Sequence, residues 1–316
     1  MPAPPDLLTL LERRTVALRK NRPDLAEALD LQELLIRTTL QTARPPRAEP
    51  FPLPREQAAG RIRQGIPLLH DQPVALDIHF AADLFSRLVD ELAERGAGEL
   101  TTRLEPIIDA ATRGALDPEH LFDEAFVQHA DHLAQTAADA GLDADLLLTL
   151  ATKAVAPLLQ AYAERLLPLI DRVDDGTSQG ATWTMGFCPI CGGWPLLGEL
   201  RGVELALWLR CSACSSGWRG QRLVCPYCAN HDYRSLGSLA IEGEPRFRIS
   251  VCDRCKGYLK VANAFDPTPA ALLALDDVAS LHLDVAAIER GYQRPADSGF
   301  RIELTTPEAE WLEELA

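Results

Sequence analysis

Eight cysteines stand in four C-x-x-C pairs, and no cysteine is left over. A C-x-x-C on a tight turn places two sulfurs on the same side of the backbone, at the separation that two corners of a tetrahedron need. Two such pairs complete a four-sulfur site, so the chain is expected to bind two metal ions. The predicted ligands are Cys188, Cys191, Cys211, Cys214, Cys225, Cys228, Cys252 and Cys255.

The spacing of the pairs favours a sequential combination, the first pair with the second and the third with the fourth. The gaps between pairs are 19, 10 and 23 residues, and each long gap can hold a hairpin. An interleaved cross-brace is the alternative. Pro189 and Pro226 are expected to stiffen two of the turns, and Gly192 permits a positive φ after the first knuckle.

The ligand set leaves the metal open. Four thiolates in a tetrahedron suit zinc or a single rubredoxin-like iron. A thiol–disulfide couple in one of the pairs is the redox alternative, but four identical pairs in one small region disfavour it.

The compartment is predicted from the N-terminal residues and from the charge. Arg13 and Arg14 resemble a twin-arginine export signal, but no apolar run follows them, so the pair is interpreted as a solvated helix face. We therefore expect the cytoplasm, where reduced cysteines bind metal. The net charge of −15 argues against nucleic acid and anionic membranes as partners. No stretch approaches the roughly 18–20 apolar residues of a membrane span.

The elements that must position the cysteines follow from periodicity. Residues 1–175 are predicted to form an all-α, bundle-like domain, as in the four-residue apolar spacing of Ile78–Leu92. A linker is expected at 176–182. Residues 183–265 then form a small two-metal rubredoxin-like domain, with ten Lys and Arg against six Asp and Glu within 181–265. A C-terminal helix and tail, 266–316, should pack on the rest, with Trp311 docking back.

The predicted module contains three strand-like segments, at Val203–Leu209, Tyr233–Ile241 and Phe247–Val251. The fold class is therefore a mostly α N-terminal domain followed by a small α+β module. That module carries two rubredoxin-like or zinc-ribbon-like four-cysteine sites and is followed by a C-terminal helix.

Other polar residues have simpler interpretations. His129 and His132 lie at i and i+3 with Asp123 and Glu124 nearby, but no third metal ligand is apparent, so a structural or surface role is expected. His231 is expected in a surface or supporting role because eight cysteines already fill two sites. Asp276 and Asp277 are most simply a helix N-terminal charge pair. No catalytic triad, phosphate loop or paired-carboxylate motif stands out, so the protein is predicted not to be an enzyme.

The cysteine knuckles and their flanks resemble the formate dehydrogenase accessory protein FdhE family. The resemblance covers roughly 188–292, and the helical first half carries no diagnostic motif. The segment 300–316 departs from the short ending expected for the family. The matching stretches are 188–195, 207–214, Trp218 with Arg222, 225–228, 252–260, 276–284 and 291–292.

The resemblance implies a cytoplasmic maturation factor that binds the catalytic subunit of a respiratory formate dehydrogenase before that subunit is exported. It also implies rubredoxin-like sites and favours iron over zinc. Two other functions stay open: a rubredoxin-like redox protein that carries electrons or acts on client thiols, and a zinc-ribbon adaptor for nucleic-acid machinery.

The partner surface is expected near the metal sites, where tryptophans and arginines concentrate. Aromatic and arginine side chains are the usual anchors of interfaces. The predicted partner-binding residues are Arg210, Trp218, Arg222, Tyr258, Asp276 and Asp277.

Overall fold

The computed structural model describes residues 6–42, 53–95, 99–171, 182–244 and 246–305. It confirms the predicted fold class: helices come first, and a sheet with short C-terminal helices follows. Two compact units emerge from the contacts. The sheet unit comprises Met1–Thr42, Thr184–Phe187 and Trp194–Ala296, and the helical unit comprises Ala43–Trp183, Cys188–Gly193 and Asp297–Ala316.

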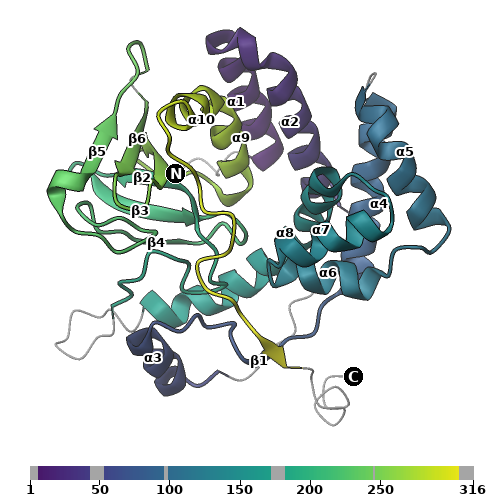
Figure 1. Cartoon of the computed structure of the whole chain (residues 1–316), viewed down its shortest axis with the longest axis horizontal. Coiled ribbons are helices and arrows are strands. Elements are labelled where there is room, and N and C mark those ends of the chain that lie inside the picture. The colour runs from purple at the N-terminus through teal and green to yellow at the C-terminus, as the bar shows by residue number, and fades with distance from the viewer. Residues whose placement is uncertain (1–5, 43–52, 96–98, 172–181, 245, 306–316) are drawn as a thin grey trace. The chain divides into compact units, whose positions relative to one another are not determined.

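This grouping differs from the expected domains at the N-terminus. The first two helices, α1 (Leu7–Asn21) and α2 (Ala26–Leu40), belong to the sheet unit. They form a hairpin, and α2 packs against α9 (Leu273–Ala279), as Figure 1 shows. Periodicity predicts the helices but does not reveal their partner. The predicted linker 176–182 lies almost wholly outside the described residues.

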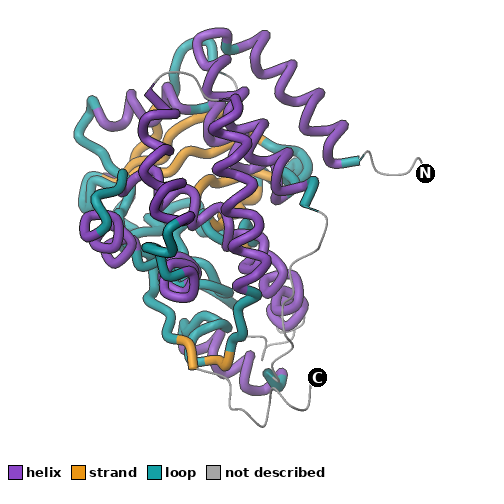
Figure 2. Tube along the Cα trace, turned by 90° about the vertical axis from the view of Figure 1, so that its right-hand side faces the viewer, coloured by secondary structure: helices purple, strands orange, loops and turns teal. Residues whose placement is uncertain are grey.

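The helical unit is built around one long helix, α8 (Ala144–Asp171). Its most extensive contacts are with α4 (Ile78–Arg95), α6 (Pro118–Phe126) and α7 (Ala130–Asp139). The remaining helices of this unit are α3 (Arg55–Gln64) and α5 (Glu99–Thr112). Figure 2 draws them in purple. Buried leucines and aromatics of α4, α6 and α8 form the core.

One helix corrects the expectation that no apolar stretch reaches the length of a membrane span. Among the described residues, Ala144–Ile170 is long and apolar enough by length and composition. Half of its most apolar window is buried inside the protein. Leu147, Leu158 and Tyr162, for example, are at most 1% exposed. A buried core helix passes the same test, so this criterion is weak support for a membrane span.

The sheet has six strands and consists of two similar halves. Each half runs knuckle, strand, strand, knuckle, strand, and the order β4-β3-β2-β7-β6-β5 joins the halves through parallel β2 and β7. All other neighbours are antiparallel. The strands are β2 (Pro195–Arg201), β3 (Ala206–Cys211), β4 (Gly217–Arg219), β5 (Leu236–Leu239), β6 (Phe247–Cys252) and β7 (Tyr258–Asn263).

The three predicted strands are found with shifted ends. Val203 lies in the turn before β3, and Tyr233 opens a short 3₁₀ turn (Tyr233–Ser235) before β5. The predicted C-terminal helix is broken into α9 and α10 (Leu281–Ile288) at Ser280. The hydroxyl of Ser280 donates to the carbonyl oxygens of Asp276 and Asp277, a local bond that competes with the helix backbone.

The described part of the C-terminal segment is held in place by strand pairing and burial. The short strand β8 (Leu304–Thr305) pairs in parallel with β1 (Gln72–Pro73) inside the helical unit, and Figure 2 shows the two in orange. Ile302 is 1% exposed. The predicted docking of Trp311 lies outside the described residues.

Candidate metal centres

The four cysteine knuckles share one backbone geometry. In each, the N–H of the first cysteine donates to the carbonyl five residues later, at 2.8–2.9 Å. In each, the residue four positions after the first cysteine has a positive φ, between 54° and 74°. Those residues are Gly192, Ser215, Ala229 and Lys256. The positive φ predicted for Gly192 is therefore confirmed, and the other three knuckles adopt it without glycine.

The knuckles combine sequentially, as the gap lengths favoured. One cluster contains Cys188, Cys191, Cys211 and Cys214, and the other contains Cys225, Cys228, Cys252 and Cys255. The sulfurs of each cluster all lie within 4.8 Å of one another. In the second cluster two sulfur pairs are 3.7 and 3.8 Å apart. A tetrahedron with metal–sulfur bonds of about 2.3 Å has edges of about 3.8 Å, so this donor set fits such an ion.

Backbone N–H groups point at several sulfurs. The N–H of Ile190 lies 3.4 Å from the sulfur of Cys188, and the same distance separates Ala213 from Cys211 and Gly257 from Cys255. Such donors stabilise thiolate charge. The knuckles can therefore hold ionised sulfur for a divalent metal.

The first knuckle is fixed by the helical unit, to which it belongs. Its four successive carbonyl oxygens each accept a hydrogen bond from elsewhere in that unit. The pairs are Leu68 N to Pro189 O (2.8 Å), Leu69 N to Ile190 O (3.0 Å), Gln128 Nε2 to Cys191 O (2.9 Å) and Phe300 N to Gly192 O (2.9 Å). The cysteine-ligand turn is thus rigid even at its backbone.

The second cluster is more accessible and electrostatically uneven. Cys228 and Cys255 are partly exposed. Burial raises the pKa of Cys225 and of Cys255. Burial also opposes ionisation of Cys252, but hydrogen bonds from the N–H groups of Cys255 and Arg254 and from the Asn230 amide outweigh it and lower its pKa to about 7. Cys252 therefore ionises more readily than Cys225 or Cys255.

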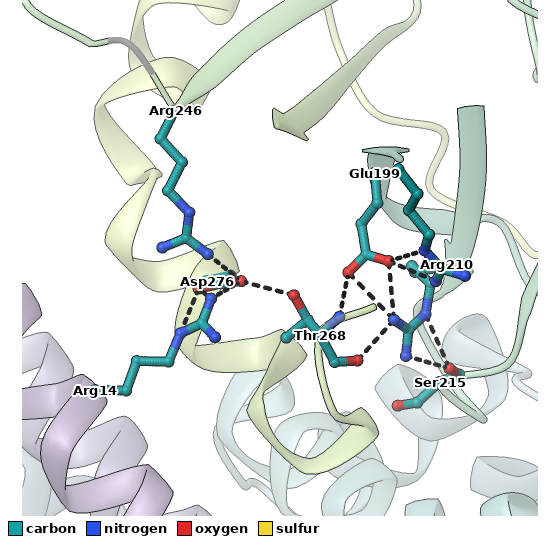
Figure 3. A network of polar contacts seen from close by, with 8 residues as sticks. Arg14, Glu199, Arg210, Ser215, Arg246, Thr268 and Asp276 are labelled. Carbon is teal, nitrogen blue, oxygen red and sulfur yellow. Dashed lines mark hydrogen bonds and ion pairs between the residues drawn. The ribbon is translucent and has the colours of Figure 1, made fainter. Parts of the chain in front are cut away.

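Two of the predicted partner-binding residues anchor a buried ionic network in the sheet unit (Figure 3). Arg210 and Glu199, both nearly inaccessible, pair at 3.1 Å, and Arg210 also donates to the carbonyl oxygens of Ser215 and Thr268. Asp276 is 1% exposed and accepts from Arg14 and Arg246. These contacts hold the loops around the first cluster and α9 in place.

The bond from Arg14 to Asp276 corrects the interpretation of the arginine pair as a solvated face for Arg14, whereas Arg13 is exposed as expected. Both Nε and Nη2 of Arg14 donate to the carboxylate, at 3.1 and 2.6 Å, and Nη2 reaches the other oxygen at 2.5 Å. Asp276 is therefore a buried acceptor within α9, and α9 begins three residues earlier at Leu273. Asp276 does lie in the first turn of α9, as expected of a helix N-terminal charge, but it is buried and ion-paired.

A second ionic network engages Tyr258 and Asp277. Lys260 is fully buried, and its Nζ lies 2.7 Å from Asp277 and 2.6 Å from Asp284. The Tyr258 hydroxyl donates to Asp284 at 2.7 Å. Burial opposes ionisation of Asp277, but Arg294 and Lys260 overcome it and lower its pKa. Both residues therefore have structural partners inside the unit.

The last two predicted partner residues differ in accessibility. Trp218 is 3% exposed, and its indole N–H has no hydrogen-bond partner in the described part of the chain. Arg222 is exposed. His231 is exposed as well. Of the six residues predicted to contact a partner, Arg222 is the one whose side chain is fully available at the surface.

A groove beside the second cluster is the feature that sequence reasoning missed. It has a volume of about 650 Å³, and Leu200, Leu207, Leu259 and Val261 of three strands form its apolar floor. Its lining also includes Arg222, Leu223, Arg248, Cys225 and Cys252. Leu223 is 69% exposed. The alternation of side chains along β2, β3 and β7 puts the four residues of the floor on one face of the sheet. Of these four, only Leu207 lies within a strand that the sequence predicted.

Comparisons with known proteins agree with this architecture. A family model described as the FdhE C-terminal domain matches residues 223–300. Relatives called "Protein FdhE homolog" include one from Pseudomonas aeruginosa, 36% identical over 129 residues, which are 38% of this chain and 41% of the relative. One from Pectobacterium carotovorum is 27% identical over 77% of this chain and 79% of its own.

The extent of these matches varies. The alignments to the homologs from Pseudomonas aeruginosa and Aquifex aeolicus span 41% and 51% of those proteins. The crystal structure of the FdhE protein from Pseudomonas aeruginosa matches 95% of this chain and 98% of its own, with a TM-score of 0.54 and 24% identity, which establishes the fold. The domain match, the relatives and the fold together confirm the resemblance that the cysteine knuckles predicted, which is to the FdhE family.

Proposed function

We propose that this protein is a cytoplasmic, non-enzymatic accessory factor for formate dehydrogenase, and that it binds the catalytic subunit before export. Family resemblance supports the link to formate dehydrogenase formation. The structural observation that carries the binding role is the groove on the sheet face.

The groove fits a segment of a client chain that is apolar with an acidic side chain. Its floor is made of leucine and valine side chains, which gain free energy when water is displaced. Arg222 and Arg248 line it, and neither has an ion-pair partner among the described residues. Two uncompensated guanidinium groups beside an apolar floor favour a carboxylate on the partner, because arginine binds carboxylates through two parallel hydrogen bonds.

A pull-down of the catalytic subunit tests this assignment. The double variant Arg222→Glu with Arg248→Glu should reduce binding at least tenfold while both metal ions stay bound. The matched control is Arg234→Glu with Arg290→Glu, which reverses two exposed charges of the same unit outside the groove. Equal binding by the groove variant and the wild type would show that the client binds elsewhere.

The metal is proposed to be iron in both sites, on the strength of the family resemblance, with zinc as the alternative. Elemental analysis and visible absorbance of anaerobically purified protein distinguish them, because zinc is colourless and has no redox chemistry.

A rubredoxin-like redox role is the second candidate, and the partial exposure of Cys228 and Cys255 favours it. Electrons reach a solvent-accessible centre more readily than a buried one. Reversible bleaching by a mild reductant, confined to one of two bound irons, would support this role. A zinc-filled protein would rule it out for these sites.

A further inference from the structure

The turn between α6 and α7 brings together three side chains able to bind a metal ion. The sequence places Asp123 and Glu124 near His129 and His132 without singling out a ligand, and the structure brings Glu124 to the two histidines. The Nδ1 atoms of both histidines and a carboxylate oxygen of Glu124 lie within 4.8 Å of one another. All three residues belong to the helical unit, and none takes part in the cysteine clusters.

The turn holds these residues through its backbone. The N–H of His129 donates to the carbonyl of Glu124 (2.9 Å), and the N–H of Gln128 donates to that of Ala125 (3.3 Å). Gln128 has a φ of 64°. This is the Schellman pattern that ends a helix. It fixes Glu124 in the last turn of α6 and His132 in the first turn of α7, so the donors converge without needing a flexible loop.

The geometry of the donors suits a small ion. Glu124 Oε2 lies 2.9 Å from Nδ1 of His129 and 2.8 Å from Nδ1 of His132. Ligands about 2.0–2.1 Å from a metal are separated by about 2.9 Å in an octahedron and about 3.3 Å in a tetrahedron. The two distances from Glu124 Oε2 to the histidine nitrogens need to lengthen by no more than about half an ångström to admit the ion.

The hydrogen bonds also define the metal-free state. An ionised carboxylate only accepts, so each histidine must carry its proton on Nδ1 when it contacts Glu124. To bind a metal through Nδ1, each neutral ring shifts its proton to Nε2 through solvent. The exchange releases no net proton from neutral rings, and Glu124 changes from hydrogen-bond acceptor to ligand.

We propose that Glu124, His129 and His132 form a third metal site, which takes a first-row divalent transition-metal ion such as Zn²⁺, Fe²⁺ or Ni²⁺. Two imidazoles and one carboxylate select such ions over Ca²⁺ and Mg²⁺, which prefer oxygen ligands. The His132 side chain is 59% exposed. The ion therefore keeps open positions toward solvent, unlike an ion held by four cysteines.

The site lies between two helix ends, the C-terminal end of α6 and the N-terminal end of α7, so the dipoles of the two helices oppose each other there. The same turn is joined to the first cysteine knuckle, because Gln128 Nε2 donates to the carbonyl of Cys191 at 2.9 Å. The third site therefore lies on a turn anchored to the first cluster's backbone.

Zinc titration of the full-length protein, purified with both cysteine clusters loaded, tests the site. Equilibrium dialysis with elemental analysis should give three metal ions per chain for the wild type, one of them the added zinc, and two for Glu124→Gln or His132→Ala. His132 is exposed, so its replacement leaves the core intact. The matched control His79→Ala removes an exposed histidine on α4 and should still bind three.

Cobalt gives an independent reading with the cysteine clusters kept filled with zinc. Co²⁺ in the third site should lack the intense thiolate-to-cobalt absorption that a cysteine site produces. The affinity for Co²⁺ should fall at least tenfold in either variant. Two ions per chain in the wild type at excess zinc would overturn the proposal. So would a third ion bound equally by Glu124→Gln and the wild type.

Discussion

The two four-cysteine clusters share one knuckle geometry and differ in their surroundings. In the first, every cysteine is at most 1% exposed, and its leading knuckle offers four carbonyl oxygens that are all hydrogen bonded. In the second, two of the four cysteines are partly exposed, and the cluster adjoins an open groove. Identical local sequence patterns therefore produce one centre enclosed by protein and one near solvent.

The two clusters share one sequence motif, but their different exposure to solvent suits them to different roles. An enclosed centre contributes mainly to folding, because metal binding and burial stabilise the same state. A partly exposed centre can exchange ions or electrons. The comparison therefore predicts that the same substitution, made at matched positions, has unequal effects.

Removal of one ligand from each cluster should give the largest difference. Cys214→Ser is expected to lower the free energy of unfolding by more than about 4 kcal/mol, because it strands three buried thiols without their metal. Cys228→Ser should cost about half as much, since its cluster reaches solvent. Urea denaturation with metal analysis measures both. Equal losses would contradict the contrast between the two clusters.

Substitutions at the knuckle residue with a positive φ should give the next largest effect on stability. A Cβ added at Gly192 would lie 2.5 Å from the carbonyl oxygen of Phe300, in a left-handed backbone conformation. Gly192→Ala is therefore expected to destabilise the protein by about 2–3 kcal/mol. Ala229 has the same conformation, with φ 54°, and is exposed. Ala229→Gly should relieve strain and stabilise by about 0.5–1 kcal/mol. Thermal unfolding of the two variants side by side would show opposite signs, and a shared sign would refute the argument.

The smallest expected effect is kinetic. A colorimetric chelator should remove the ion of the second cluster at least about tenfold faster than that of the first, a difference of about 1.4 kcal/mol in the opening step. The Cys228→Ser protein, which lacks the second site, should lose the fast phase and keep the slow one. Loss of the slow phase instead would reverse the assignment of the clusters.

Local patterns predicted much of this molecule. Cysteine spacing predicted two four-cysteine clusters and favoured their sequential pairing, which the structure contains, because a C-x-x-C turn determines its own geometry. Periodicity predicted the helical first half, and β-branched and apolar runs placed three of the six strands of the sheet, β3, β5 and β6, to within a few residues. Each of these features depends on neighbours in the chain.

Contacts between distant segments were not predictable in the same way. The sequence suggests that Asp276 is a helix N-terminal charge, and only the fold places Arg14 and Arg246 beside it. Tyr258 is predicted to contact a partner, but its hydroxyl donates to Asp284 within the same unit. Glu124 lies five residues before His129, and only the helix-ending turn makes it a third donor. Burial and register, which come from the whole fold, decided these roles.

The N-terminal hairpin of α1 and α2 is synthesised long before the segment against which it packs. Its apolar face, with Leu11, Leu18 and Ile36, packs in one cluster with Leu272 and Leu275. Arg14 binds Asp276, which lies 262 positions later in the chain. At about 5–20 residues per second, the hairpin leaves the ribosome on the order of 10–50 s before its partner. During that interval its leucines face water or another protein, so the nascent chain is most prone to aggregate before its last helices are made.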